Sequence, residues 1–354
     1  MRRALVGVVI ILVFIQVLAL WPKPLEHQPA KAEVDPEAVK REVSPEKSYL
    51  ARGIPRNRIP EYSIEGFDST STENGEKQWH IHATRARMFS HEKLMHTLEV
   101  QANLFNPDGS LTVIVGKEAK YFMDQRDLEV FGEVVTTFPD GFRVESQYLQ
   151  YQPAKRRILI PIPHTVKGGG PQADGKELAF ESIGLDYDML SAKAKLLRSA
   201  RVRMIEPPPT KESTTIVSDT CDIDRTQQRA AFHMFPTRPV KDRFVWVEQP
   251  NLSGNGRWAT LFYGSGNQVV HDMTLFEDVT VRELADQGKE KGKVLRYGTG
   301  GRADFDNRKN IVELTELPQV YQDQDTVTGD LIRIFRDTDM VEVEKSNAFS
   351  EGGN

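Results

Sequence analysis

Apolar residues at every second position constrain the fold of this chain more than any other feature of its sequence. Within the stretch 116–135, the alternating apolar residues are Ala119, Tyr121, Met123, Leu128 and Val130. A period of two is typical of a β-strand with one buried face, and the polar residues 124–127 are typical of a turn. Gly132 interrupts the second run, which predicts a bulge that a larger side chain would distort. The stretch is therefore predicted to be an antiparallel strand pair.

Imperfect copies of this strand pair recur along the chain at a spacing of about 30 to 40 residues, which is in the range of repeat architectures. The copies are the segments 145–160, 181–204, 218–235, 256–281, 301–321 and 328–348. Because no copy is close to identical to another, chance alternation in a β-rich chain accounts for some of them. We interpret the remainder as a structural repeat.

Strands are predicted from Glu61 onward, and helical signals are nearly absent after Lys47. Three dipeptides are typical of hairpin turns: Asn74-Gly75, Asp108-Gly109 and Asp140-Gly141. The strongest break is the proline-rich segment 206–210, and we place a domain boundary there. The polar residues 283–296 are predicted to form a surface loop.

The first 58 residues differ in kind from the rest. An apolar run of eighteen residues, 4–21, follows Arg2 and Arg3. At 1.5 Å per residue such a helix is about 27 Å long, enough to span a thin bilayer, and the arginines keep the N-terminus cytoplasmic. The alternative is a cleavable signal peptide, but its small-x-small site, 30–32, lies about ten residues beyond the apolar run.

These features predict four segments. Residues 1–21 are a cytoplasmic tip and retained single-pass anchor, 22–58 are a proline-rich stalk, and 59–206 and 207–354 are two β domains. In a bacterium this places the anchor in the inner membrane and the bulk of the chain in the periplasm.

Composition excludes several classes of function. A net charge of −5 and a pI near 6.0 give no electrostatic basis for binding nucleic acid. The single cysteine, Cys221, excludes an intrachain disulfide framework, and we expect it to be a half-buried strand residue.

Candidate catalytic and metal-binding groups are weak. His80, His82, His91 and His96 provide imidazoles, but no cysteine or carboxylate stands at ligand spacing, so we expect solvent-facing histidines. The clustered aspartates lack the spacing and glycine of a calcium loop and are predicted to be turn carboxylates; they are Asp219, Asp222, Asp224, Asp323 and Asp325. No nucleophile elbow or phosphate loop is found. The sequence therefore predicts no enzyme, no cofactor and no metal.

Several short motifs in the run 61–151 carry a family resemblance. They are Tyr62-Ser63-Ile64-Glu65-Gly66-Phe67, Trp79 before an alternating strand, Ala119-x-Tyr121 and Gly132-Glu133-Val134. With these motifs the run resembles the LptC family of periplasmic lipopolysaccharide-export proteins, and the anchor and spacer stand in the order found in that family. The later segments 327–332 and 339–343 resemble strand pairs of the soluble relative LptA. Family members usually carry one such domain, whereas two are predicted here.

The resemblance implies an all-β fold of two open, twisted β-jellyroll domains of antiparallel strands after one N-terminal transmembrane helix. In each domain two sheets splay like a V and hold acyl chains between them, and domains dock edge to edge. The implied function is a non-enzymatic adaptor that passes lipopolysaccharide, or a related glycolipid, towards the outer membrane. The implied partners are an inner-membrane ABC transporter and, by edge-strand docking, an LptA-type bridge protein or an outer-membrane translocon.

Two sheets that do not close leave a trough that can be both core and ligand site. The residues expected to face into this lipid-binding groove are Ile81, Val100, Leu104, Val115, Tyr121, Leu128, Val130, Phe138, Leu261, Tyr263, Ile311, Ile332 and Ile334. For each of them taken alone, ordinary sandwich core is the favoured explanation, so the alternation predicts the inward face but not an opening.

Two other classes of function remain open at this point. One is an envelope scaffold whose β repeats bind other proteins or peptidoglycan. The other is a glycan-active enzyme on a β-solenoid, which needs a pair of carboxylates facing a cleft. Asp304 and Asp306 are the candidate pair, although acids beside an alternating strand are usually solvated.

Overall fold

The computed structural model describes residues 60–350, apart from 74, 90–91, 173–174, 210–211, 264–271, 287–292, 323–324, 337–339 and 346. By its contacts the chain divides into two units, Met1–Arg56 and Asn57–Asn354, and all described residues lie in the second. The predicted anchor, 1–21, and the predicted stalk, 22–58, lie outside the described residues. Within the described part, no helix has the length and apolar character needed to cross a membrane.

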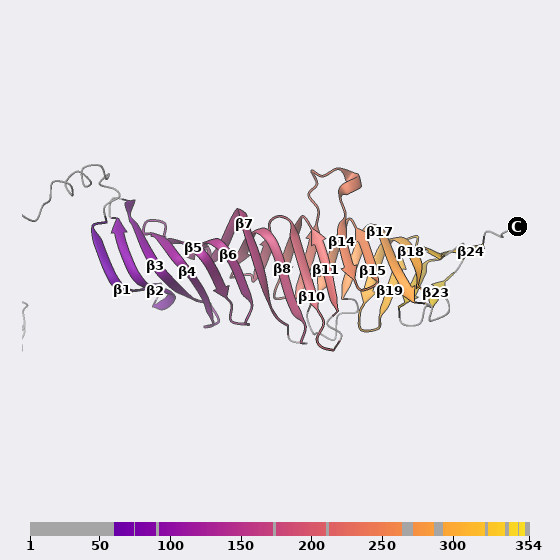
Figure 1. Cartoon of the computed structure of the whole chain (residues 1–354), viewed down its shortest axis with the longest axis horizontal. Helices are drawn as coiled ribbons and strands as arrows, with labels where there is room; N and C mark the ends of the chain where they lie inside the picture. Colours follow the sequence, from indigo (N-terminus) through magenta and orange to yellow (C-terminus); the bar gives the residue numbers. More distant parts are fainter. Residues whose placement is uncertain are drawn as a thin grey trace, which may run out of the picture. The chain divides into compact units, whose positions relative to one another are not determined.

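The all-β prediction is confirmed. Every strand pairing is antiparallel, and the described residues contain no α-helix; short 3-10 turns include η3 (Pro153–Lys155) and η4 (Val240–Asp242). The strands are β1 (Tyr62–Glu73), β2 (Glu76–Phe89), β3 (Leu94–Phe105), β4 (Leu111–Phe122), β5 (Asp127–Thr137), β6 (Arg143–Gln152), β7 (Arg157–Pro171), β8 (Glu177–Asp188), β9 (Lys193–Leu196), β10 (Ala200–Ile205), β11 (Ser213–Ser218), β12 (Thr220–Asp224), β13 (Arg229–His233), β14 (Val245–Gln249), β15 (Leu252–Gly256), β16 (Trp258–Phe262), β17 (Met273–Asp286), β18 (Lys293–Asp306), β19 (Ile311–Thr315), β20 (Gln319–Gln322), β21 (Asp325–Thr328), β22 (Leu331–Phe335), β23 (Val341–Glu344) and β24 (Asn347–Ser350). Within the unit Asn57–Asn354 they succeed one another along its length (Figure 1).

Three hairpin turns lie where the sequence predicts them, between β1 and β2, β3 and β4, and β5 and β6. Each turn carries its glycine at a positive φ, from +80° at Gly109 to +85° at Gly75. A residue with a Cβ rarely adopts this conformation, which is why glycine recurs in these turns.

The long strands bend near their middle. In β4 the buried side chains are Thr112, Ile114 and then Ala119, so the buried phase slips by one residue. The pairing of β4 with β5 shifts at the same place, between Val115 and Glu118. A slip of one residue turns the following side chains to the other face of the strand. The chain therefore turns a corner there while its apolar side chains stay inside.

This corner, which we call the crease, divides the strands between two walls. Each of β1–β8, β17 and β18 gives one half to each wall. Wall A also contains β9, β12, β13, β16, β19, β22 and β23, and wall B also contains β10, β11, β14, β15, β20, β21 and β24. The hairpin turns form the outer edge of each wall. We call the space between the walls the trough, and the side on which the two outer edges face each other the mouth.

The walls continue without interruption past the proline-rich break. Strands β10 and β11, on either side of it, pair from Ala200 opposite Ser218 to Ile205 opposite Ser213, and the amide N–H of Glu206 donates to the carbonyl of Glu212 at 2.8 Å. The division into 59–206 and 207–354 remains a prediction.

The predicted surface loop 283–296 is wrong at both ends. Strands β17 and β18 pair through this region as far as Asp286 opposite Lys293, and the described residues on either side of 287–292 are therefore strand rather than loop. Glu283 stands directly opposite Arg296, and both are buried. The charges that suggested a loop neutralise each other, so the polar composition did not prevent strand formation.

Candidate functional site

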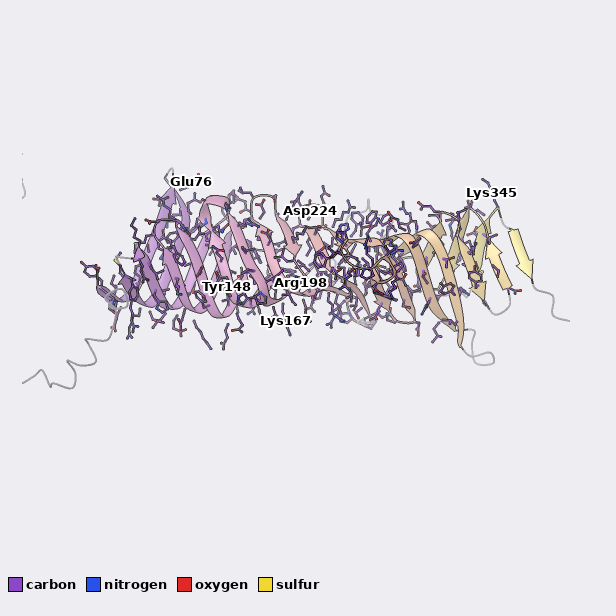
Figure 2. The ribbon with its side chains drawn as sticks, turned by 90° about the horizontal axis from the view of Figure 1, so that it is seen from above. Glu76, Tyr148, Lys167, Arg198, Asp224 and Lys345 are labelled. Carbon is purple, nitrogen blue, oxygen red and sulfur yellow. The ribbon has the colours of Figure 1, made fainter. Side chains whose placement is uncertain are left out.

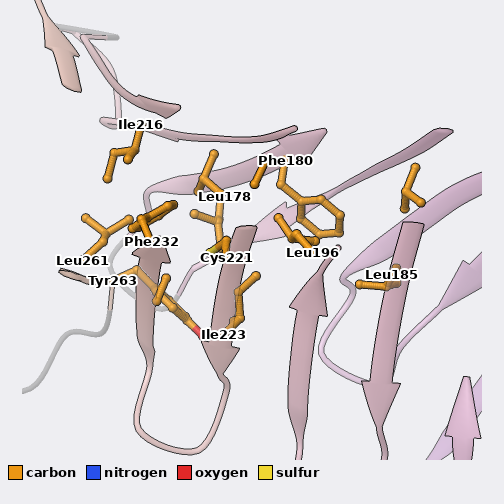
Figure 3. Packing of buried hydrophobic residues seen from close by; sticks show 14 of the residues in the cluster. Leu178, Phe180, Leu185, Leu196, Ile216, Cys221, Ile223, Phe232, Leu261 and Tyr263 are labelled. Carbon is orange, nitrogen blue, oxygen red and sulfur yellow. The ribbon is translucent and has the colours of Figure 1, made fainter. Parts of the chain in front are cut away.

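The trough holds one apolar cluster to which both walls contribute. Figure 3 shows part of it: Leu178, Phe180 and Ile216 come from wall B and meet Leu196 and Phe232 of wall A. The opposite faces of the walls carry charged side chains, among them the exposed residues Glu76, Lys167, Arg198 and Lys345 (Figure 2). Each wall is therefore apolar towards the trough and charged towards solvent.

Most residues predicted to face the groove lie in this cluster. Ten of them are less than a tenth exposed: Ile81, Val100, Leu104, Leu128, Val130, Phe138, Leu261, Tyr263, Ile332 and Ile334. Tyr121 is partly buried, packs against the cluster and makes an edge contact with Trp79 at 5.3 Å between ring centroids. These residues share the inward face, and their contact with lipid remains a prediction.

Val115 does not face the trough. Its side chain is 45% exposed, whereas the neighbouring Ile114 is fully buried. Counting every second residue back from Tyr121 places Val115 on the inward face. The slip at the crease lies between the two residues and breaks this count. Because the slip inverts the faces, Val115 lies on the outer face.

Ile311 is also misplaced by one position. Strand β19 buries Val312 and Leu314, while Ile311 is only partly buried. Val312 stands opposite the buried Phe305 of β18, and directly opposed residues of an antiparallel pair point to the same face. The inward residue of this strand end is therefore Val312.

The predicted bulge at Gly132 is present, since the pairing of β5 with β6 shifts between Phe131 and Val134. Gly132 has a φ of +73°, and a Cβ placed on it would lie 3.3 Å from the Cβ of Lys117 on the outer face. The glycine with least room towards the trough is Gly116, where a Cβ would lie 2.3 Å from Val130 Cγ1.

Gly116 is therefore expected to tolerate substitution less well than Gly132. Gly116→Ala forces Val130 to move and is expected to lower the free energy of unfolding by about 1–3 kcal/mol. Gly132→Asn is the matched control, because asparagine adopts positive φ more readily than other residues with a Cβ. Thermal unfolding of the full chain, followed by circular dichroism, compares the two. Equal losses would contradict this assignment.

A small cavity opens between the walls near the middle of the described part. It has a volume of about 100 Å³. Its apolar lining includes Val144 and Leu178 from wall B, Leu185 and Ile223 from wall A, and the ring of Tyr263. Burial raises the pKa of Tyr263 to about 12, so its hydroxyl stays neutral at physiological pH. Apart from Asp140 and Arg225, which also line it, the cavity thus offers a largely apolar surface.

A buried ion pair, which the sequence did not point to, lies further along the trough. Glu283 and Arg296 are less than a twentieth exposed, and the guanidinium of Arg296 donates to Glu283 Oε2 at 3.1 Å and to Gln322 Oε1 at 3.1 Å. Glu283 continues the inward alternation of Val279 and Val281 in β17. The inward face of the trough therefore carries a charged pair at this step.

The histidines face outward. His80 and His82 both contact the carboxylate of Asp68, at 3.0 and 3.1 Å, and His96 contacts Glu118 at 2.9 Å. His91 lies outside the described residues. Within the described part, no group of three or more histidine, cysteine, aspartate or glutamate side chains could hold a metal ion. Cys221 is fully buried rather than half-buried, and burial raises the pKa of its thiol.

The clustered aspartates at 219, 222 and 224 have structural partners. Asp219 accepts two hydrogen bonds of 2.6 Å from Arg238, and Asp222 and Asp224 pair with Lys195 and Lys193 across β12 and β9. Burial favours the neutral form of Asp219, but the hydrogen bonds from Arg238 and the Phe235 amide outweigh it and lower its pKa.

The two carboxylates considered for glycan chemistry are also engaged. Asp304 accepts hydrogen bonds from Thr274 at 2.7 Å and Arg302 at 2.7 Å, and Asp306 accepts amide hydrogen bonds in the turn that follows β18. Because they hold the strand end in place, we assign them no catalytic role.

Comparison with known proteins gives a family match for the first half of the chain. Residues 38–206 match the family model described as "Lipopolysaccharide-assembly, LptC-related". A search of curated proteins returned no match. Among solved structures, one similar chain is LptH of Pseudomonas aeruginosa, described as the LptA homologous periplasmic component of a lipopolysaccharide transport device. It has 15% identity and a TM-score of 0.32, over 39% of this chain and 95% of LptH. Residues 38–206 of this chain are thus similar to the LptC-related family of lipopolysaccharide-assembly proteins.

Proposed function

We propose that this chain is a membrane-anchored periplasmic adaptor that takes lipopolysaccharide from an inner-membrane ABC transporter and passes it along the trough towards the outer membrane. The observation that carries this proposal is the apolar trough, which begins within the LptC-related segment and continues beyond residue 206. Strands β10 and β11 pair across that point in wall B, and β9 and β12 pair across it in wall A, so neither wall is interrupted there.

The trough would act by offering acyl chains the contacts that its own side chains now make with one another. Moving a methylene group from water to an apolar surface is favourable at every position along such a face. A path without one deep minimum allows transfer, because a single strongly favoured site would hold the lipid. Energy for net movement would come from ATP hydrolysis in the transporter, and this chain needs no catalytic group of its own.

The ends of the walls offer docking surfaces. Among the described residues, β1 pairs only with β2, and at the other end β23 pairs only with β22 and β24 only with β21. An edge strand presents backbone N–H and C=O groups that another strand can pair with. On β1, Tyr62 is 61% exposed and Ile64 is 47% exposed. We propose that such edges bind the transporter at one end and an LptA-type bridge or the outer-membrane translocon at the other.

Photo-crosslinking tests the proposed function. A photoreactive amino acid at Leu128, which is 3% exposed, is expected to capture lipopolysaccharide during ATP-driven export from membrane vesicles. The matched control is the same amino acid at Glu129, the next residue of β5, which points to the outer face and is expected to capture none. If Leu128 captures no lipid while export proceeds, the proposal is wrong.

A further inference from the structure

Arginines on the outer edge of wall A reach across the mouth to the outer edge of wall B. Arg156, in the turn between β6 and β7, donates to the carbonyl oxygen of Phe105 at 3.1 Å and to Gln78 Oε1 at 2.6 Å. Arg336, which follows β22, donates to Gln249 Oε1 at 3.2 Å. These contacts join residues that are distant in sequence and lie on different walls, so they close the mouth.

Arg225, in the turn between β12 and β13, also crosses the mouth but has a different partner. Its guanidinium forms an ion pair with Asp140, in the turn between β5 and β6 of wall B. The same guanidinium lies over three aromatic rings, at 5.2 Å from the centroid of Phe138, 5.6 Å from Phe142 and 5.9 Å from Tyr187. Arg156 donates to neutral groups, and Arg336 also lies 3.9 Å from the buried Glu283 carboxylate. The Arg225–Asp140 closure differs from both in that its charges lie above an aromatic floor.

The floor belongs to the small cavity described above. Phe138, Phe142, Tyr187, Asp140 and Arg225 all line it, together with the apolar residues that both walls contribute below. Arg225 therefore covers the place at which free space reaches the mouth. Beneath the guanidinium the surface is aromatic and aliphatic, which suits a methylene chain.

We propose that the Arg225–Asp140 pair is a latch, and that an acyl chain enters or leaves the trough through the cavity beneath it when the pair separates. This inference rests on the proposed function, because it takes the lipid to be lipopolysaccharide. The carboxylate of Asp140 is 54% exposed, so water screens the attraction and can solvate it when the pair opens. Separating the pair moves Arg225 away from the cavity and uncovers it at the mouth.

The test uses the full chain with a photoreactive amino acid at Leu185, which is 2% exposed and lines the cavity. Purified lipopolysaccharide is added, and the rate of capture on irradiation is measured. Asp140→Asn is expected to raise this rate by about two- to five-fold, the factor that corresponds to an exposed ion pair. Arg225→Lys, which keeps the charge, is expected to stay closer to the parent protein.

A covalent cross-link across the mouth tests the opposite change, a latch that cannot open. Cysteines at 140 and 225, bridged by a short bis-maleimide with a reducible linker, are expected to reduce capture at Leu185 to background, and reduction is expected to restore it in the same molecules. Cys221 is fully buried and does not compete for the reagent. The control bridge joins cysteines at Glu129 and Gln150, which stand opposite each other on the outer face and do not span the mouth.

The outcomes separate the latch from the proposed function. If Leu128 captures lipopolysaccharide and the bridge across the mouth leaves capture at Leu185 unchanged, the latch is wrong and the carrier role stands. If neither position captures lipid in any variant, both are wrong. Capture at Leu185 that is blocked by the bridge, restored by reduction and unaffected by the control bridge supports the latch.

Discussion

Replacing Arg296 by methionine is expected to destabilise the C-terminal part of the walls by about 3 kcal/mol, the lower end of the range for breaking a buried ion pair. The substitution removes the nearer of two arginines that pair with the buried Glu283 carboxylate, and Arg336 Nε remains 3.9 Å from it. Arg296 is 1% exposed, so water cannot replace the lost hydrogen bonds without opening the trough. In an array whose strands contact mainly their neighbours, this loss is local. Hydrogen exchange of the amides of β17 and β18 in the full chain is the measurement that detects it.

The double variant Glu283→Leu/Arg296→Met is the control for this prediction. Removing both charges exchanges the ion pair for apolar side chains, which is often neutral or stabilising. Most of the protection lost in the single variant is therefore expected to return. If the double variant is as unstable as Arg296→Met, the loss comes from packing of the arginine stem rather than from the carboxylate that has lost its nearer arginine.

Phe232→Ala is expected to cost about 3–5 kcal/mol, the range for deleting a fully buried aromatic ring from a core. Phe232 is 0% exposed and lies in the middle of β13, where Figure 3 shows it beside Leu261. The alanine leaves a void in the trough that the neighbouring strands cannot fill without moving. Urea unfolding of the full chain, with hydrogen exchange across β12, β13 and β16, measures the loss.

Phe262→Ala provides the comparison for Phe232→Ala. Phe262 is only partly buried, on the outer face of β16, and the Arg229 guanidinium lies 5.6 Å from its ring centroid. Its removal is expected to cost about 0.5–1 kcal/mol, the value of an exposed cation–π contact. A loss equal to that of Phe232→Ala would contradict the assignment of inner and outer faces.

Alternation predicted the inward face correctly for most residues of a run that stays within one wall, with Ile311 of β19 as an exception. Leu128 and Val130 precede the crease in β5, and Ile332 and Ile334 occupy a strand that never crosses it. Val115 is misassigned because the crease slips the phase of β4. Gly116 lies at this slip, but a glycine within a strand is equally typical of an ordinary bulge. In β3 the residue with positive φ at the crease is Glu99, an ordinary strand residue in composition.

The contacts across the mouth had no signal in the sequence. Arg225 and Asp140 are separated by 85 positions, and each occupies a polar turn of a common type. Which turn of wall A meets which turn of wall B depends on how far the strands tilt along the crease, and this follows from the packing of the whole trough. The pair Glu283–Arg296 was missed for a related reason, since a run of charges predicts solvent exposure unless the partner across the strand pair is known.

The regular succession of strands also sets how far the chain can reach. Among the described residues, each wall runs through seventeen strands or half-strands from β1 to β23 or to β24, which gives sixteen steps. Neighbouring strands are about 4.8 Å apart, so each wall measures roughly 75 Å along its length. Every inserted strand pair would add about 10 Å to this span without altering the cross-section of the trough. The number of strand pairs in one chain therefore sets the distance that the chain spans. A longer chain would replace separate subunits in bridging a given distance.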